Sequence, residues 1–465
     1  MGTDGDMGKA AERFVSREVG PGTRIHYFHA PRFKDLSLSV AWRVNLERET
    51  VTRVALVPSV LRRGTRSFPT ARDLARRCEE LYGCRISSRV YRLGEQQVWW
   101  VGLDFPHPRY VEGSGYLEGV LGLLGELMWQ PVTEDGGFRS DYVAEEREVL
   151  RRALRARFNN KASWANLRCV EEMCAGERYA LHPLGREEDL DAIDPRTLYA
   201  SYRDILAHGH LDVVAVGDWE ALAPGGAADP SGAGVAEILR PLLPRTAGDA
   251  HGPDADGPGE ECPGERRPGP LAPVEVKAAR AEVRQVVEHQ PVSQSRLVVG
   301  LRTTVTMGHD LFPALLFLDG LLGRYAHSRL FVNVREKAGL AYYANTMLDP
   351  VKGIVLMVAG IEGKAFQKAR DTSLEQLYAL GRGEIGDGEW EATYRSLRAE
   401  VASWSDDPDG LAWGLLEGLT AGRDFTPAEV VAAVDRVTRE QVVEVARRLQ
   451  PDTVYFLTGE GATAT

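Results

Sequence analysis

Hydrophobic and polar residues alternate along several short segments of the chain. Residues 36–44 read LSLSVAWRV, a period of two that is typical of a β-strand with one buried face and one wetter face. The apolar runs at 95–105 and 353–363 have the length and composition of further strands. Residues 138–156 and 390–404 carry apolar residues at helical spacing instead. The pattern therefore predicts both strands and helices.

The same order of predicted elements occurs twice along the chain. The strands at 84–93 and 95–105 correspond to those at 340–349 and 353–363. Each half then continues with helices and closes with a helix and a strand that runs into glycine. Colinear order of this kind indicates an internal duplication. We therefore expect an α+β fold of two homologous half-domains, each a mostly antiparallel sheet covered by helices.

A stretch rich in Gly, Pro and Asp separates the two halves. Residues 223–273 contain APGGAADPSGAG and GPDADGPGEECPGERRPGP, a composition with little to bury, which predicts a flexible linker. The predicted half-domains are then 1–222 and 274–465. A chain of 465 residues is also longer than one hydrophobic core usually supports. Two halves on such a linker suggest a clamshell.

Composition excludes several classes of function. The chain has 67 acidic and 56 basic side chains, and its formal net charge is −11, which argues against general binding of nucleic acid or acidic membranes. The first residues lack an apolar segment, and the most apolar run, 311–323, is short and carries Asp319, so we expect neither a signal peptide nor a membrane span. Five cysteines without a C-x-x-C pair fit free thiols in a reducing cytoplasm.

The most informative motif is HSRLFVNVREKAGLAYYANT at 327–346. It predicts a helix that carries Arg335 and ends at Gly339, followed by a strand with Tyr342 and Tyr343. The helix end and the strand start can therefore direct Arg335 and Tyr342 into one cleft. From spacing alone, the favoured interpretation is a solvated helix charge and an aromatic residue that packs on the sheet.

This motif is similar to the S-R-L-F…V-R-E-K-x-G-L-A-Y stretch of the insulinase/pitrilysin-type metallopeptidases. FPALLFLDGLLG (312–323), DVVAVGD (212–218) and LRRGT (61–65) also resemble the family, so the resemblance covers most of the chain. It implies two related half-domains that form a clamshell and usually assemble with a second chain.

The resemblance also implies a role for the Arg/Tyr pair. In the family, the residues that match Arg335 and Tyr342 hydrogen-bond the substrate beside the scissile bond. A guanidinium and a phenol can both donate to a peptide carbonyl and stabilise the oxyanion that forms on hydrolysis. Neighbouring residues of a strand face opposite sides, so strand register decides between Tyr342 and Tyr343. The motif favours Tyr342.

The zinc motif of the family is missing. Active members bind zinc through H-x-x-E-H on a helix and a distal glutamate. Matching through LRRGT places Ala55 and Ser59 at the histidines and Pro58 at the glutamate, and Ala153 takes the position of the distal ligand, whereas Glu146 is retained. We expect a kink or an early end of the helix at Pro58, because an interior proline costs roughly 3 kcal/mol.

Lost ligands and a retained Arg/Tyr pair predict a subunit that is not active alone. The chain itself would need no cofactor, and zinc is expected in a partner subunit of the same family, with which it would form a heterodimer that cleaves peptides. Within the family, residues 45–87 most resemble the bacterial group associated with EF-P 5-aminopentanol modification. The alternatives are a scaffold subunit without a part in proteolysis, or a module that binds extended peptides along a strand edge.

Overall fold

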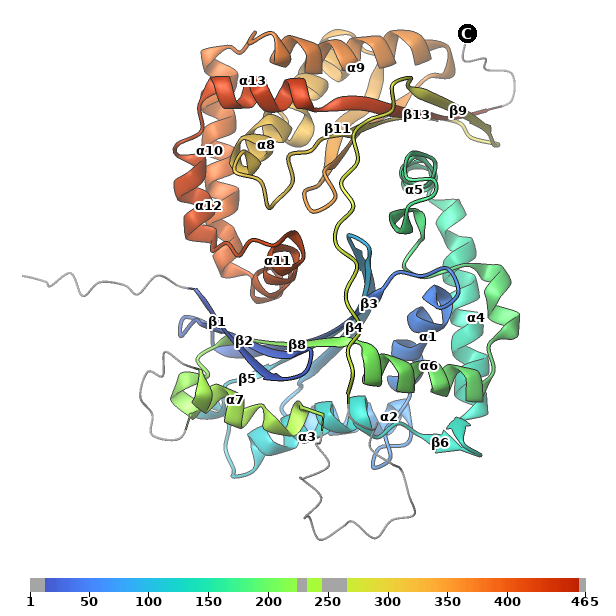
Figure 1. The fold of residues 1–465 in the computed structure, drawn as a ribbon, viewed down its shortest axis with the longest axis vertical. Coiled ribbons are helices and arrows are strands. Elements are labelled where there is room, and N and C mark those ends of the chain that lie inside the picture. The colour runs from blue at the N-terminus through green and yellow to red at the C-terminus, as the bar shows by residue number, and fades with distance from the viewer. Residues whose placement is uncertain (1–12, 224–231, 245–265, 460–465) are drawn as a thin grey trace, which may run out of the picture. The chain divides into compact units, whose positions relative to one another are not determined.

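The computed structural model describes residues 13–223, 232–244 and 266–459, and the chain divides into two compact units (Figure 1). Each unit holds one main sheet and a set of helices, which confirms the predicted α+β class. Among the described residues, unit 1 comprises 13–154, 182–223, 232–244, 266–272 and 408–413, and unit 2 comprises 155–181, 273–407 and 414–459.

Unit 1 is built on a six-stranded sheet with the strand order β1-β2-β8-β3-β5-β4. Neighbouring strands are antiparallel except β2 and β8, which are parallel. The strands are β1 (Phe14–Gly20), β2 (Thr23–His29), β3 (Asp35–Asn45), β4 (Arg85–Leu93), β5 (Gln96–Pro106) and β8 (His210–Gly217).

Helices α1, α3 and α6 cover one side of this sheet (Figure 1). Their apolar side chains form one core with the sheet, in which the rings of Trp42 and Trp99 stack at 6.4 Å. The remaining elements of the unit are α1 (Val51–Leu61), α2 (Ala71–Glu80), α3 (Tyr116–Trp129), the short hairpin β6 (Thr133–Glu134) and β7 (Gly137–Phe138), α4 (Ser140–Ala156), α6 (Pro195–His208) and α7 (Ala233–Ile238).

The central strand β3 departs from its predicted exposure. Its alternation LSLSVAWRV suggested one wetter face, but Ser37, Ser39 and Arg43 are buried together with the apolar positions. The prediction of a wetter face is therefore wrong for this strand. The alternation instead separates an apolar face from a face of paired polar groups, since the Arg43 Nε donates to Asp212 Oδ2 at 2.7 Å.

Unit 2 repeats the topology of unit 1 with a five-stranded sheet in the order β11-β12-β10-β13-β9. The pair β13 and β9 is parallel and all other neighbours are antiparallel. This order matches β4-β5-β3-β8-β2 of unit 1 strand for strand, so the predicted duplication is confirmed. The strands are β9 (Arg284–His289), β10 (Ser295–Arg302), β11 (Ala341–Asp349), β12 (Ile354–Ile361) and β13 (Gln450–Thr458).

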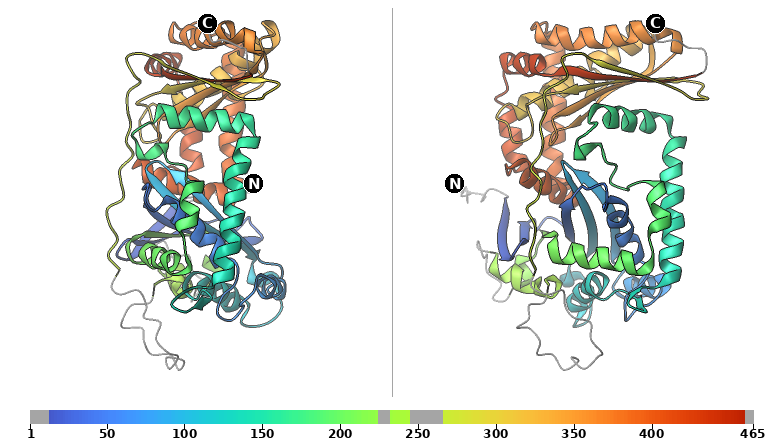
Figure 2. Two further views of the ribbon diagram at one scale, coloured as in Figure 1. Left: turned by 90° about the vertical axis from the view of Figure 1, so that its right-hand side faces the viewer. Right: turned by 45° about the vertical axis from the view of Figure 1, so that its right-hand side comes forward.

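Helices lie on both faces of the unit 2 sheet. Figure 2 shows α5 on one face and α9 with α13 on the other. The helices of the unit are α5 (Lys161–Met173), α8 (Phe312–Asp319), α9 (Phe366–Gly381), α10 (Asp387–Ser403), α11 (Pro408–Ala421), α12 (Pro427–Val434) and α13 (Arg439–Arg448), and the π-helical segments are η7 (Gly320–Arg324) and η8 (Leu330–Lys337). The first six residues of α11 belong to unit 1.

Helix α5 packs in unit 2 although its sequence lies in the first half of the chain. Cys169, Val170 and Met173 of α5 are buried against the strands β10, β12 and β13. Residues 408–413 show the reverse, since they belong to unit 1. There Trp413 lies 5.9 Å from the ring of Trp100. Each half of the chain thus contributes a segment to the unit formed by the other half.

The described parts of the predicted linker 223–273 are docked on unit 1. Residues 232–244 include α7, and Val235, Leu239 and Leu242 are buried in the core of the unit. The Nε of Arg266 donates to the carbonyl oxygen of Leu206 at 3.0 Å, at the end of α6. The remaining linker residues, 224–231 and 245–265, lie outside the described part of the chain.

Local sequence signals set the helix boundaries. Thr70 caps α2 and exchanges hydrogen bonds with Asp73, and Thr426 caps α12 in the same way with Glu429. Gly422 ends α11 with a φ of 76°, a conformation that favours glycine. Every helix within the described residues is too short or too polar to span a bilayer.

Candidate functional site

Helix α1 contains Ala55, Pro58 and Ser59. These are three of the four residues predicted to stand in place of the zinc-site residues of active relatives. Ala55 and Pro58 are buried, and Ser59 is half-buried. The helix does not end at Pro58 but continues to Leu61, so the expected early end is wrong. Almost every side chain of α1 is buried, and we attribute the continuation of the helix to this packing, which outweighs the hydrogen bond that proline cannot donate.

The side chains at these positions do not fit a zinc ion. Ala55 and Ala153 present methyl groups, Pro58 has no side-chain donor or acceptor, and Ser59 offers only a hydroxyl. Zinc in proteins is bound by imidazole, thiolate or carboxylate groups. Ala153 is exposed on α4. The donor set that active relatives use is therefore absent from the four matched positions.

The retained carboxylate of Glu146 is paired with an arginine. Glu146 is only 9% exposed on α4, and its Oε1 lies 3.4 Å from Arg63 NH1. Arg63 also contacts Glu145 and lies over the ring of Tyr142. Burial raises the pKa of Glu146, while the charge of Arg63 lowers it. An arginine thus neutralises the carboxylate that is retained in this part of the molecule.

Arg335, the arginine of the predicted Arg/Tyr pair, lies in the last turn of η8. Its guanidinium is exposed and lies over the ring of Phe331, 4.4 Å from the ring centroid. The helix ends as predicted near Gly339, which has a φ of 59°. π-Helical turns occur frequently at functional sites because the extra residue in the turn redirects side chains.

Tyr342 lies at a β-bulge in β11. Ala341 pairs with Ile361 and Tyr343 pairs with Gly360 in the neighbouring strand, so Tyr342 is the extra residue between them. Its side chain is 62% exposed. Because a bulge changes the direction of one side chain, Tyr342 reaches the surface of unit 2 at the start of the strand.

Tyr343 packs on the sheet instead. Its ring lies under the guanidinium of Arg296, 5.7 Å from the ring centroid, and borders the core formed with α5. Burial raises the pKa of the Tyr343 hydroxyl. The two neighbouring tyrosines therefore occupy different environments, and Tyr342 is the one that an external ligand can reach.

The structure brings Arg335 and Tyr342 onto adjacent elements. Segment η8 packs against β11, and both side chains are exposed on unit 2. The guanidinium of Arg335 lies over the ring of Phe331. Two exposed donors on neighbouring elements can both donate hydrogen bonds to the carbonyl oxygens of an extended peptide.

The opposite side of η8 borders a polar cavity of about 470 Å³. Arg329 lies in its wall, where its Nε donates to Glu389 Oε2 at 3.1 Å. The Nδ2 of Asn333 donates to Gln376 Oε1 at 2.6 Å across the same cavity. These contacts fix η8 to α9 and α10, so the helix that carries Arg335 is held from its other side.

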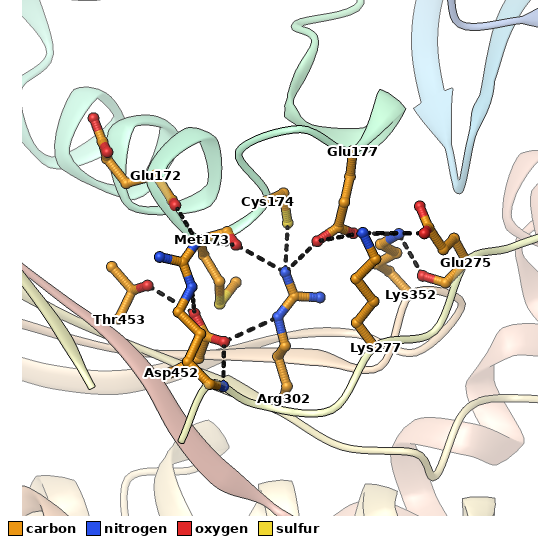
Figure 3. Close-up of polar contacts among 11 residues, drawn as sticks. Glu172, Met173, Cys174, Glu177, Glu275, Lys277, Arg302, Lys352, Asp452 and Thr453 are labelled. Atoms are coloured by element: carbon orange, nitrogen blue, oxygen red, sulfur yellow. Dashed lines mark hydrogen bonds and ion pairs between the residues drawn. The ribbon is translucent and has the colours of Figure 1, made fainter. Parts of the chain in front are cut away.

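Unit 2 also contains a buried ion-pair cluster (Figure 3). Arg302, Glu177 and Lys352 are at most 7% exposed. The NH2 of Arg302 lies 2.6 Å from Glu177 Oε1, and the Nζ of Lys352 lies 2.9 Å from Glu177 Oε2. Burial alone would raise the pKa of Glu177, but Lys352 and Arg302 lower it. The cluster ties the segment after α5 to the sheet of unit 2.

The sequence analysis did not find this cluster. Two charged residues in otherwise apolar strands carry the signal: Arg302 is the last residue of β10, and Asp452 is the third residue of β13. The Arg302 Nε lies 3.3 Å from Asp452 Oδ2. Unit 1 has the corresponding pair Arg43 and Asp212 at the end of β3 and the start of β8. Alignment of the two halves on these charges would have shown the repeat of the ion pair.

Comparison with known proteins places the chain in a family. A family model described as peptidase M16 inactive domain matches residues 256–397. The chain is 32% identical over 446 residues to the probable inactive metalloprotease YmfF of Bacillus subtilis (strain 168), covering 95% of this chain and 97% of that protein. It is 27% identical over 161 residues to the uncharacterized zinc protease YmxG of the same organism, covering 34% of this chain and 39% of that protein.

A solved structure shows the same fold. A conserved protein from Enterococcus faecalis V583 superposes with a TM-score of 0.83 at 24% identity, covering 97% of this chain and all of that one. The fold and the missing zinc donors thus define the class of protein, a homologue of inactive metalloproteases. The chain belongs to the peptidase M16 family, which confirms the predicted insulinase/pitrilysin-type relationship.

Proposed function

We propose that this chain is the non-zinc subunit of a heteromeric metallopeptidase. It would bind peptide substrate and position it with Arg335 and Tyr342, while a zinc-bearing relative supplies the metal and the general base. The partner's zinc would polarise the scissile carbonyl and activate water there. The guanidinium and the phenol of this chain would hold the peptide and stabilise the charge that develops on its carbonyl oxygen.

The observation that carries the proposal is the exposure of Tyr342 at the bulge of β11, next to Arg335 on η8. A tyrosine that served only to pack on the sheet would resemble Tyr343, which lies under Arg296. A bulge that turns one aromatic residue outward instead suits contact with a ligand. This arrangement favours a peptide-positioning role over the solvated-charge interpretation.

The proposal of a zinc-bearing partner rests on the loss of zinc donors in this chain and on its relatives. Ala55, Ser59 and Ala153 leave no imidazole or carboxylate at the matched positions. In Bacillus subtilis the similar proteins include one named as a probable inactive metalloprotease and one named as a zinc protease. A genome that encodes both kinds of chain can supply both subunits of a heterodimer.

The cellular role can be placed more narrowly. We propose a cytoplasmic protein, because five cysteines without a C-x-x-C pair fit free thiols. The likeness of residues 45–87 to the group associated with EF-P 5-aminopentanol modification suggests that the peptide substrate is connected with that modification. Measuring EF-P modification in cells that lack this gene tests that connection.

A scaffold subunit without a part in proteolysis is the alternative. It is favoured by the extensive burial of α1, in which Ala55 and Pro58 are themselves buried. A scaffold would assemble with its partner but would be indifferent to changes at Arg335 and Tyr342. A module that only binds peptide would do so as an isolated chain.

The test uses a complex of this chain with an H-x-x-E-H relative from the same genome. Arg335→Ala and Tyr342→Phe should each lower the turnover of peptide by about a hundredfold without loss of assembly, since removal of one donor to a developing oxyanion costs that much. Arg395→Ala and Tyr378→Phe are matched controls, because both residues are exposed elsewhere in unit 2. Unchanged turnover in both site variants supports the scaffold instead.

A further inference from the structure

Two cysteines of unit 1 lie together at the corner between α2 and β4. Cys78 is in the last turn of α2 and is half-buried, and Cys84 directly precedes β4 and is 4% exposed. Both are free thiols in the structure. Their spacing of six residues does not match C-x-x-C, so a C-x-x-C motif does not mark this pair in the sequence.

The backbone between the two cysteines reverses direction. Tyr82 has a φ of 57° and Gly83 a φ of 73°, so two consecutive left-handed residues fold the chain back. The amide of Gly83 donates to the carbonyl oxygen of Cys78 at 2.9 Å, and the amide of Cys84 donates to the same oxygen at 3.2 Å. These two hydrogen bonds to one carbonyl oxygen keep the backbones of Cys78 and Cys84 next to each other, and a disulfide can join only residues that lie this close.

The thiols also interact with each other. The neighbouring Cys84 side chain lowers the pKa of the Cys78 thiol, while Cys78 and burial raise the pKa of the Cys84 thiol. The thiolate is the nucleophilic form of cysteine. The half-buried sulfur of Cys78 is therefore the one suited to react with an oxidant, and the buried sulfur of Cys84 is in place to resolve the product.

We propose that Cys78 and Cys84 form a redox-active dithiol that hydrogen peroxide oxidises to an intramolecular disulfide. The Cys78 thiolate attacks one peroxide oxygen, the O–O bond breaks, and hydroxide leaves, which gives a sulfenic acid. The Cys84 sulfur then attacks the Cys78 sulfur, the S–O bond breaks, and the released hydroxide takes the thiol proton as water. Two electrons pass from the dithiol to peroxide, and a thiol reductant reverses the reaction.

The chain contains a matched pair that should not react. Cys169 and Cys174 are separated by five residues, and both are fully buried in unit 2. Burial raises the pKa of the Cys169 thiol. Its Sγ points to the carbonyl oxygen of Thr453 at 3.9 Å, while the Cys174 Sγ lies 3.5 Å from Arg302 NH2. The two cysteine pairs are therefore similarly spaced in the sequence. They differ in their exposure to solvent and in the groups that their sulfur atoms face.

The test is a thiol count on the folded full-length chain after treatment with hydrogen peroxide. Two of the five thiols should disappear, peptide mapping should find Cys78 joined to Cys84, and dithiothreitol should restore both thiols. Cys84→Ser should stop at a sulfenic acid on Cys78 that dimedone traps, Cys78→Ser should retain its thiols, and Cys174→Ser should behave as the wild type.

Several results would overturn the proposal. They are a wild-type chain that keeps all five thiols, a disulfide between other cysteines or between two chains, irreversible oxidation of Cys78 alone, and equal loss of thiols in Cys78→Ser. Circular dichroism of both variants before treatment establishes that they are folded. The outcome is independent of the proposed peptidase function, because it requires neither a partner nor a peptide.

Discussion

The Arg43 Nε donates to Asp212 Oδ2 at 2.7 Å, and both side chains are buried in unit 1. The corresponding positions of unit 2 hold Arg302 and Asp452, whose Nε and Oδ2 lie 3.3 Å apart. The two pairs lie at the same ends of equivalent strands. Duplication has thus kept a buried ion pair in each sheet, next to segments that differ between the two units.

Loss of the arginine in unit 1 should destabilise that unit. Arg43→Ala leaves the fully buried Asp212 with His26 and Arg24 as its remaining partners among the described residues, and breaking a buried ion pair costs about 3 kcal/mol or more. Hydrogen exchange in β3 and β8 should accelerate accordingly. Arg85→Ala is the control, because Arg85 is exposed and lies 4.0 Å from Asp104. Equal exchange in both variants would contradict the role of the buried pair.

The same pair predicts an acid dependence. Burial by itself would raise the pKa of Asp212, but Arg43 and His26 lower it to about 2. Since the folded state holds this group below its usual pKa of 3.8, its contribution is present above about pH 4 and is lost as the pH falls toward 2. The contribution amounts to about 2 kcal/mol. The free-energy gap between wild type and Asp212→Asn, measured by urea unfolding, should therefore narrow as pH falls through this range; a constant gap would be inconsistent with the lowered pKa.

The buried cluster of unit 2 should hold α5 on its sheet. Lys352→Met removes the ammonium group that lies 2.9 Å from Glu177 Oε2 at a fully buried site and leaves Arg302 as the buried partner of Glu177, which should cost about 3 kcal/mol. Hydrogen exchange in α5 should rise. The double variant Lys352→Met/Glu177→Gln should recover part of the loss, because residue 177 then carries no buried charge that has lost one of its cationic partners. If the stability losses of Lys352→Met and Glu177→Gln simply added in the double variant, the two residues would not act as a pair.

Arg63 should stabilise the charged form of Glu146. Burial raises the pKa of this carboxyl and Arg63 opposes the rise, so Arg63→Ala should raise it further. A raised carboxyl pKa in the folded state means that stability is lost as pH rises through the folded value. Arg63→Ala should therefore lose stability relative to wild type as the pH rises above the usual carboxyl pKa of about 4.3, by about 1 kcal/mol. Arg63→Ala/Glu146→Gln should lack this pH dependence in the same urea titration.

The two adjacent tyrosines should respond differently to truncation. Tyr343→Ala removes a ring that packs between Arg296 and the core of unit 2, and should lower the free energy of unfolding by about 3 kcal/mol. Tyr342→Ala should change it by less than about 0.5 kcal/mol, because its side chain is largely exposed. Urea unfolding of the two variants gives the comparison. A larger loss for Tyr342→Ala than for Tyr343→Ala would contradict the exposed position of Tyr342 at the bulge.

Much of the fold could be predicted from local patterns. The alternation in β3, the apolar runs of β5 and β12, and the helical spacing of α4 and α10 each mark one element, and their repeated order implies two related sheets. Gly339 marked the end of η8 because a left-handed residue there favours glycine. Such signals are local, so they survive without knowledge of tertiary contacts.

Contacts between segments far apart in the sequence could not be predicted from local patterns. These are the packing of a segment from one half of the chain on the other unit and the pairing of distant charged residues. The packing of α5 on unit 2 depends on buried Cys169 and Met173 meeting strands that are more than a hundred residues away in sequence. The pairing of Arg302 with Glu177 has the same character. The bulge that separates Tyr342 from Tyr343 depends on register with β12, and sequence alternation alone does not reveal an extra residue.

The central claim is that this chain contributes to peptide cleavage only together with a zinc-bearing relative. The most direct measurement is the initial rate of peptide hydrolysis by this chain alone, by an H-x-x-E-H relative from the same genome alone, and by their equimolar mixture, with zinc content determined for each. We expect zinc in the relative, none in this chain, and hydrolysis only in the mixture. Stoichiometric zinc and full hydrolytic activity in this chain alone would contradict the account.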